Sequence, residues 1–311
     1  MRSHSHSLSK RHFLASLASA TAAVVAPHAS AIDPMPRKGP PRLLLSLAAY
    51  SVRNHFGGPL ANGSDKPAAA PEFNMFSFLD YCASHHCAGA ELTSYFFPKN
   101  VDNTYLADVR KHAFLKGISI SGTAIGNNFS LEKGPKRDEE IAKCKTWIDR
   151  ASILGAPHIR VFAGHNKNLP REQADRLVVE ALEECADHAG SKGIFLGIEN
   201  HDAIGSAEHL LKLIANIKSP WLGVNLDSGN FRTPNPYSDF ERCLPYAVNI
   251  QLKTEMRPEG QTTPQLADLP KLVSLIKKSG YQGFVALEYE APDSPLSAIP
   301  LILANLRSLL S

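Results

Sequence analysis

The sequence predicts a single α/β domain, a (β/α)8 barrel, from three observations. Eight short apolar segments have the character of strands, each is followed by a segment with helical periodicity, and residues 42–311 are close to the usual length of about 250 residues for this fold. The strands are expected at residues 43–49, 89–93, 118–123, 158–162, 194–200, 222–227, 248–253 and 284–289. Strands that are separated by helices run parallel, with right-handed crossovers.

Helical patterns fill the intervals between these strands. They are expected at residues 75–86, 103–116, 138–154, 171–192, 206–217, 237–243, 263–279 and 294–310. Pro170 is suited to open one of them, and Gly193 and Gly280 are suited to end two others. The alternative is an open, doubly wound sheet, which would place a Gly-rich phosphate-binding loop after the first strand. The G-x-G-x-x-G pattern is absent there, which favours the barrel.

Residues 1–31 have the features of an export signal. Lys10-Arg11 precedes an apolar, Ala-rich stretch over residues 15–26, and Ala29-Ser30-Ala31 fits an A-x-A cleavage site. The segment resembles a twin-arginine export signal with Lys10 in place of the first arginine. Ordinary secretion, a membrane tether and a disordered tail are the alternatives. We expect an exported, periplasmic protein, with a Pro-rich linker over residues 32–41 and the barrel over residues 42–311.

Composition narrows the class of partner. The 43% hydrophobic content suffices for one large domain, and the net charge of +3 is scattered along the chain. A nucleic-acid surface would need a concentrated basic face, so we expect no nucleic-acid partner. No run is long and apolar enough to span a bilayer in the mature chain. The five cysteines, at irregular spacing, predict buried thiols or at most one disulfide, and a homo-oligomer stays open.

The last four expected strands carry polar residues in the same alternation phase. One face of each strand is aliphatic, and the other face is small or polar. Glu199, Asp227, Gln251 and Glu288 end this polar face on four consecutive strands. In a barrel these ends form the mouth, where active sites are built. The four side chains are therefore expected to surround one divalent cation, the alternative being four separate polar caps on the core.

The motifs around these residues resemble a known family. They are Gly197-Ile198-Glu199-Asn200-His201, Asn225-Leu226-Asp227-Ser228-Gly229-Asn230-Phe231, Asn249-Ile250-Gln251-Leu252-Lys253 and Ala286-Leu287-Glu288-Tyr289. Over nearly the whole mature chain the sequence resembles the xylose-isomerase-like TIM-barrel superfamily of sugar isomerases and epimerases. Its endonuclease IV-like members need several further His ligands for three zinc ions, which are missing here.

The resemblance implies one divalent metal held by Glu199, Asp227, Gln251 and Glu288. The family usually has His where this chain has Gln251. Because an all-oxygen set favours hard cations, Mn²⁺ or Mg²⁺ is expected first, with Co²⁺, Fe²⁺ and Zn²⁺ as further candidates.

The implied activity is a sugar isomerase or epimerase acting on a small-molecule sugar. The metal would stabilise an enediolate, with Glu199 and Glu288 as base and acid on its two sides. The same intermediate could expel a substituent, so a lyase or dehydratase acting on a keto-sugar or keto-glycoside is the first alternative. A non-catalytic sugar-binding protein with a decayed site is the second, and the change to Gln251 favours it.

Five residues are candidates for binding substrate: His201, Lys253, Asn230, Arg160 and Asn127. His201 follows the fifth strand, and a surface role is its alternative. Lys253 could hold a substrate oxygen, or form an ion pair with Glu255 or Glu290. Arg160 ends the fourth strand in a phase that the pattern leaves open, and Asn127 could instead make the turn after the third strand.

Overall fold

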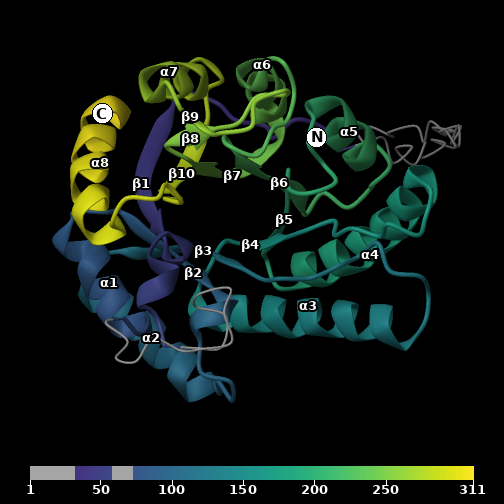
Figure 1. Cartoon of the computed structure of the whole chain (residues 1–311). Helices are drawn as coiled ribbons and strands as arrows, with labels where there is room; N and C mark the ends of the chain where they lie inside the picture. The colour runs from purple at the N-terminus through teal and green to yellow at the C-terminus, as the bar shows by residue number, and fades with distance from the viewer. Residues whose placement is uncertain (1–31, 58–72) are drawn as a thin grey trace, which may run out of the picture.

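The computed structural model describes residues 32–57 and 73–311 of the chain. Within these residues, eight parallel strands close into a barrel in the order β1-β10-β7-β6-β5-β4-β3-β2. Helices surround the strands, and the C-terminal helix α8 lies beside β1 (Figure 1). The predicted single (β/α)8 barrel is confirmed. The predicted export signal, residues 1–31, lies outside the described residues.

The barrel strands match the predicted ones to within two residues at every end. They are β1 Arg42–Ala48, β2 Gly89–Thr93, β3 Ser119–Ala124, β4 His158–Val161, β5 Phe195–Glu199, β6 Leu222–Asp227, β7 Ala247–Leu252 and β10 Gln282–Leu287. Their apolar and β-branched residues, bounded by loops, are the usual signal of buried strands.

The helices follow the predicted intervals. They are α1 Met75–Ser84, α2 Asn103–Leu115, α3 Pro135–Leu154, α4 Arg171–Ser191, α5 Ala207–Ile214, α6 Pro236–Cys243, α7 Leu269–Lys278 and α8 Pro295–Leu310, with short 3-10 helices at Ala49–His55, Ser94–Phe96 and Leu244–Tyr246. Side-chain caps explain several starts: Asp102 accepts from the N–H of Tyr105, and Ser206 from that of His209.

Helix α7 departs most from its predicted range. The pattern over residues 263–279 predicts a single helix, but α7 begins only at Leu269. Residues Gln265–Leu266 form strand β9 instead, paired antiparallel with β8, Glu255–Met256, in a small separate sheet. Asp268 then caps α7 by accepting from the N–H of Lys271 at 2.9 Å. Antiparallel pairing with the preceding segment Glu255–Met256 therefore overrode the local helical pattern.

The segment expected to be a linker packs against the barrel. The N–H of Met35 donates to the carbonyl of Pro245 at 2.8 Å, and Arg37 Nη2 donates to the carbonyl of Ala247 at 2.5 Å. The Arg37 guanidinium also lies 4.7 Å from the centre of the Tyr281 ring. These partners lie at or before the first residues of β7 and β10, so the segment covers the end of the barrel opposite the mouth.

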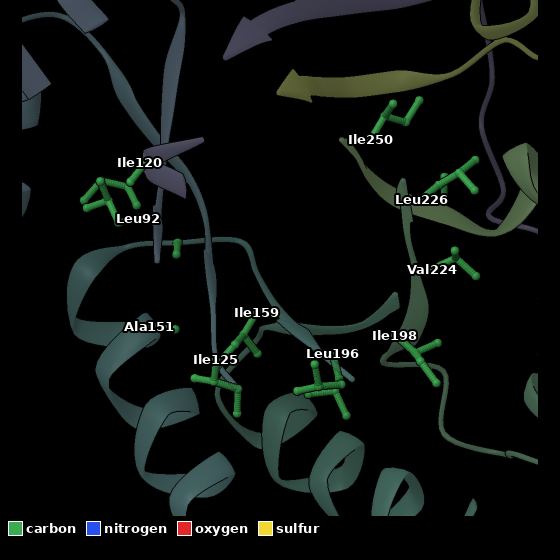
Figure 2. Packing of buried hydrophobic residues seen from close by; sticks show 14 of the residues in the cluster. Leu92, Ile120, Ile125, Ala151, Ile159, Leu196, Ile198, Val224, Leu226 and Ile250 are labelled. Atoms are coloured by element: carbon green, nitrogen blue, oxygen red, sulfur yellow. The ribbon is translucent and has the colours of Figure 1, made fainter. Parts of the chain in front are cut away.

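The two faces of the strands are buried in different ways. Aliphatic side chains such as Leu196, Ile198 and Val224 belong to the hydrophobic core between the barrel and its helices (Figure 2). The alternate residues meet inside the barrel, where Ser46 of β1 bonds Ser121 of β3 across 2.7 Å. Polar side chains therefore fill the barrel interior, where barrels usually place branched apolar ones.

The cysteines and the apolar character of the helices bear on two further expectations. All five cysteines lie in the described part of the chain as buried free thiols. Among the described residues, no helix combines the length and the apolar character needed to cross a bilayer.

Candidate active site at the barrel mouth

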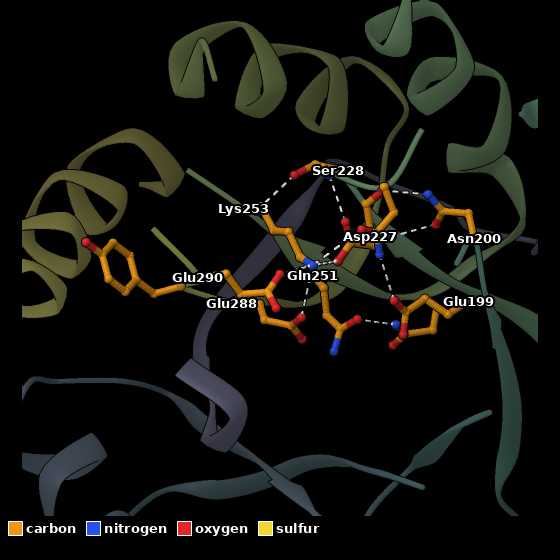
Figure 3. Close-up of polar contacts among 12 residues, drawn as sticks. Glu199, Asn200, Asp227, Ser228, Gln251, Lys253, Glu288 and Glu290 are labelled. Atoms are coloured by element: carbon orange, nitrogen blue, oxygen red, sulfur yellow. Dashed lines mark hydrogen bonds and ion pairs between the residues drawn. The ribbon is translucent and has the colours of Figure 1, made fainter. Parts of the chain in front are cut away.

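Four charged side chains meet at the carboxyl ends of the strands (Figure 3). Glu199 and Asp227 are the last residues of β5 and β6, and Lys253 and Glu288 directly follow β7 and β10. All four side chains are buried. The sequence pattern had placed the three carboxylates at this mouth, and the structure brings a cation among them.

The strand register sets the height of each side chain. In the ladder between β7 and β10, Gln251 pairs with Ala286. Both strands continue by two residues to Lys253 and Glu288, so these two side chains are level with each other. Gln251 also pairs with Asp227 across the β6–β7 ladder. Lys253, which directly follows β7, therefore lies beside Glu288, and Gln251 does not.

The Lys253 ammonium lies among three carboxylates. Its Nζ is 3.3 Å from Oδ2 of Asp227 and 3.3 Å from Oε1 of Glu288, and it contacts Oε2 of Glu290. It also lies 3.4 Å from Oδ1 of Asn230, to which it donates. The ion pair with Glu290 that the sequence left open is therefore formed.

Arg160 is the second buried cation. Its Nε is 3.0 Å from Oε2 of Glu199, and its Nη1 donates to the carbonyl of Ile125 at 2.7 Å. Its guanidinium lies 4.0 Å from the centre of the Phe162 ring. Asn230 donates through Nδ2 to Oε1 of Glu199 at 2.9 Å. Glu199 is thus held on both oxygens, and the phase of Arg160 that the sequence left open points it into the barrel.

Gln251 belongs to a polar network deeper in the barrel. Its Nε2 donates to Oε1 of Glu91 at 2.7 Å, and its Oε1 accepts from Nδ2 of Asn225 at 2.6 Å. Asn249 donates through Nδ2 both to Oε2 of Glu91 and to Oδ1 of Asn225, each at 2.8 Å. Both polar ends of the Gln251 amide are therefore already bonded to residues inside the barrel.

Burial and neighbouring charges shift the pKa values of the ionisable groups at the mouth. Burial, with Asp227 and Glu288 nearby, raises the pKa of Glu199 well above its usual value although Arg160 opposes the shift. Burial raises the pKa of Asp227 to about 7. Burial alone would lower the pKa of Lys253, but the surrounding carboxylates hold it well above its ordinary value. The lysine therefore stays charged, whereas the carboxyl group of Asp227 takes up a proton close to neutral pH.

A cavity of about 160 Å³ opens among these groups. Its lining joins aromatic and charged side chains: Tyr50, Tyr95, Phe162, Arg160, Glu199, His201, Lys253, Glu288 and Glu290. A second cavity of about 280 Å³ shares Lys253 and Glu290 with the first and is also lined by Arg53, Arg232 and Arg257. The mouth thus has a small inner chamber that holds both predicted catalytic glutamates, and a larger outer one.

The remaining predicted substrate-binding residues divide into two groups. His201 lines the inner cavity, and its ring lies 4.4 Å from that of Phe162. Asn230 lines the outer cavity and links Glu199 to Lys253. Asn127 instead bonds the backbone of Phe162, donating to its carbonyl at 2.8 Å and accepting from its N–H at 2.9 Å. Asn127 therefore holds a cavity wall in place and does not line either cavity.

Three residues of the site escaped the sequence pattern. Glu91 is an isolated carboxylate within the buried strand β2, which is itself a signal, because a buried charge needs partners. Tyr95 and Phe162 line the cavity from positions just after β2 and β4. Aromatic residues at such positions are common in cores, so the sequence offers no signal that separates them.

The fold and its mouth define an α/β-barrel protein with a chamber of buried carboxylates at the carboxyl ends of the strands. The family model of the xylose isomerase-like TIM barrel matches residues 79–309. The chain belongs to this family.

Solved structures share the fold over most of the chain. A xylose isomerase domain protein from Planctomyces limnophilus is 18% identical, with 88% of this chain and 98% of that chain covered and a TM-score of 0.63. The 3-keto-D-glucoside 4-epimerase YcjR from E. coli is 15% identical, with 86% of this chain and 100% of that chain covered and a TM-score of 0.61. The IolI protein with a binding zinc atom is 16% identical, with 86% of this chain and 96% of that chain covered and a TM-score of 0.67. A comparison with curated proteins found no match.

The predicted metal ligands do not fit a divalent cation as they are arranged. Among the described residues, no three His, Cys, Asp or Glu side chains form a group that could hold a metal. The ammonium of Lys253 stands between Asp227 and Glu288, and the oxygen of Gln251 accepts from Asn225. A dication about 4 Å from that ammonium would be repelled by roughly 8 kcal/mol at an effective dielectric constant of 20.

Proposed function

We propose that this protein is a carbohydrate epimerase or isomerase that moves a proton at a carbon beside a sugar carbonyl. One observation carries the proposal: Glu199 and Glu288 line the same small chamber, although they come from strand positions separated by β6 and β7. Two carboxyl groups on one reacting carbon are what a proton transfer between faces or between neighbouring atoms requires.

The reaction follows from the two carboxyl groups. The ionised one removes the proton from the carbon, and the C–H electron pair forms the double bond of an enediolate. The protonated one then returns a proton to the opposite face, which is epimerisation, or to the neighbouring carbon, which is isomerisation. Burial raises the pKa of Glu199 above its usual value, which is the direction that the proton-returning group requires.

The chamber suits a small, polar and partly apolar ligand. At about 160 Å³ it is smaller than the roughly 300–1,000 Å³ pockets that bind drug-sized ligands. Tyr50, Tyr95 and Phe162 line the chamber with aromatic surface against which the C–H groups of a sugar can pack, and the charged residues offer partners to its hydroxyls. The structural likeness to the 3-keto-D-glucoside 4-epimerase YcjR is consistent with a sugar substrate.

Proton exchange tests the proposal directly. Ketoses and keto-glycosides are incubated with the protein in D₂O, and incorporation of deuterium is followed by NMR. The wild type is expected to exchange at least one substrate, and Glu199→Gln and Glu288→Gln are each expected to lose roughly 100-fold or more of the rate. Glu241→Gln, at an exposed ion pair with Lys278, is the matched control. Unchanged exchange in both site variants would remove the assignment, and binding without exchange in the wild type would favour a non-catalytic sugar-binding protein.

A lyase acting on keto-glycosides is the second candidate. The outer cavity of about 280 Å³ adjoins the reaction chamber across Lys253 and Glu290, which leaves room for a leaving group. The electron pair of the enediolate would then break the bond to the substituent on the carbon next to the deprotonated one, and the protonated carboxyl group would give its proton to the leaving oxygen. Mass spectrometry separates the two outcomes, because an epimerised product keeps the mass of its substrate and an eliminated one loses the leaving group.

We also propose that residues 1–31 export the protein, on their sequence features alone. A fusion of this segment to a reporter that is active only outside the cytoplasm is expected to report export. Replacing both Lys10 and Arg11 by Gln is expected to abolish it if the route is the twin-arginine one.

A further inference from the structure

We propose that the side-chain ammonium of Lys253 takes the place of a divalent metal in this site, so that the barrel mouth works without one. The part of the proposal that concerns metal binding stands on geometry alone. The part that concerns catalysis rests on the proposed function above.

The first support is the position of the ammonium group. Lys253 Nζ lies 3.3 Å from a carboxylate oxygen of Asp227 and 3.3 Å from one of Glu288, and contacts a third carboxylate on Glu290 (Figure 3). These carboxylates come from the ends of β6 and β10, at either side of β7 in the barrel. One positive charge thus lies between Asp227 and Glu288, two of the predicted metal ligands, and offsets part of their negative charge.

The second support is that the chain is shaped to hold the lysine there. The backbone N–H of Lys253 donates to Oγ of Ser228 at 2.9 Å. A Cβ on Gly229 would lie 2.7 Å from Cδ of Lys253 and 2.7 Å from the carbonyl oxygen of Glu255. The aliphatic part of the Lys253 side chain therefore packs against Gly229 more closely than a residue with a Cβ would allow. Ser228 and Gly229 together hold Lys253 in this position.

The third support is that the residue expected to complete a metal site is occupied elsewhere. Gln251 uses its oxygen to accept from Asn225 and its nitrogen to donate to Glu91. Turning that amide towards the mouth would break both bonds inside the barrel, where polar groups without partners are costly. The exchange of a ligating residue for Gln251 and the placement of Lys253 among the carboxylates therefore describe one coherent arrangement.

A lysine in this place can supply the charge that the reaction needs. When a carboxylate removes the proton from carbon, the electron pair moves towards the carbonyl, and its oxygen becomes negative. Lys253 lines the chamber and can donate a hydrogen bond to that oxygen while it remains protonated. When the second carboxyl group returns a proton, the pair moves back to carbon, and the ammonium is unchanged. The proton balance therefore involves only the two glutamates and the substrate.

Metal binding by the wild-type protein is the decisive measurement. The full chain is purified without chelator, and its metal content is measured by mass spectrometry. Thermal unfolding is followed with and without Mn²⁺, Mg²⁺ and Zn²⁺. We expect far less than one equivalent of metal and no rise in Tm. One tightly held equivalent, or a rise in Tm that saturates at micromolar metal, would overturn the proposal whatever the protein's activity proves to be.

A double variant tests whether the site gains metal affinity when Lys253 is removed. Lys253→Ala combined with Gln251→His removes the ammonium and supplies an imidazole, and should bind Mn²⁺ at least about 10-fold more tightly than the wild type. Lys278→Ala, at an exposed ion pair, is the control and should leave Mn²⁺ binding unchanged. If the double variant folds and gains no affinity, the carboxylates do not form a latent metal site and the proposal fails. If it does not fold, the wild-type measurement still decides.

The catalytic half has its own readout. Proton exchange by the wild type is expected to be unchanged after dialysis against EDTA, and Lys253→Met is expected to lower its rate at least about 100-fold. Loss of exchange on dialysis, restored by added metal, would overturn the proposal while leaving the proposed epimerase intact. Absence of exchange with every sugar would instead count against the proposed function, and the metal measurements would keep their meaning.

Discussion

Arg160 of β4 and Glu199 of β5 form a buried ion pair, with 3.0 Å between Nε and Oε2, on the wall of the inner chamber. The pair fixes one of the two predicted acid/base groups. Asn230 bonds the other oxygen of Glu199, so the carboxyl group has little freedom to turn. Its orientation therefore depends on residues from β4 and from the loop after β6.

Replacing Arg160 by Gln should damage both stability and activity. It leaves Glu199 buried without its cation, and breaking a buried pair in this way costs about 3–5 kcal/mol of unfolding free energy. A misplaced carboxyl group should also slow proton exchange by about 100-fold. Urea unfolding and deuterium exchange measure the two effects. Arg242→Gln, at an exposed position on α6, should change neither, and equal effects in the two variants would contradict the assigned role.

Glu91 should make stability fall as the pH rises towards neutrality. Burial raises its pKa from 4.5 to about 7. Between these values the folded chain keeps a proton that the unfolded chain releases, so the contribution of Glu91 to the free energy of unfolding decreases by about 3 kcal/mol across the window. Glu91→Gln removes this decrease. Urea unfolding at pH 4.5 to 7.5 should show the variant gaining stability relative to the wild type as the pH rises, whereas Glu241→Gln should follow the wild type.

His158 should have the opposite effect in nearly the same window. Burial lowers its pKa from 6.5 to about 4. Between these values only the unfolded chain binds the proton, so the contribution of His158 is full above pH 6.5 and is lost as the pH falls towards 4. His158→Asn should remove about 3 kcal/mol of this dependence. The comparison is His86→Asn, at an exposed residue with a φ of 55°, which Asn tolerates. Parallel curves for wild type and His158→Asn would contradict the prediction.

Gly229→Ala should disturb the mouth more than the fold. The added Cβ would lie 2.7 Å from both Cδ of Lys253 and the carbonyl oxygen of Glu255, so the lysine or the loop must move. We expect a loss of about 1–3 kcal/mol in unfolding free energy, and a loss of proton exchange that stability alone does not explain. Gly205→Ala is the matched control, since its Cβ would meet nothing closer than 3.5 Å. Kinetics and urea unfolding of both variants provide the check.

Much of the fold could be predicted because it follows from local pattern. Alternation with a period of two identified the strands and showed which face of each is polar, since side chains on a strand alternate strictly. Helical periodicity located the helices between them. The exception, the start of α7 at Leu269, arises because Gln265–Leu266 pair with Glu255–Met256, and strand pairing is a contact between segments that no local pattern contains.

The sequence by itself determined the family resemblance, the barrel, and the prediction that Glu199, Asp227, Gln251 and Glu288 face one mouth. Only the tertiary structure decided their heights and partners. Gln251 and Lys253 share one face of β7, and alternation treats them alike. The pairing of β7 with β10 sets Lys253 level with Glu288 and leaves Gln251 deeper, where it meets Glu91 from across the barrel. The physical reason is that alternation specifies the direction of a side chain, whereas the stagger of a closed barrel specifies which neighbours it reaches.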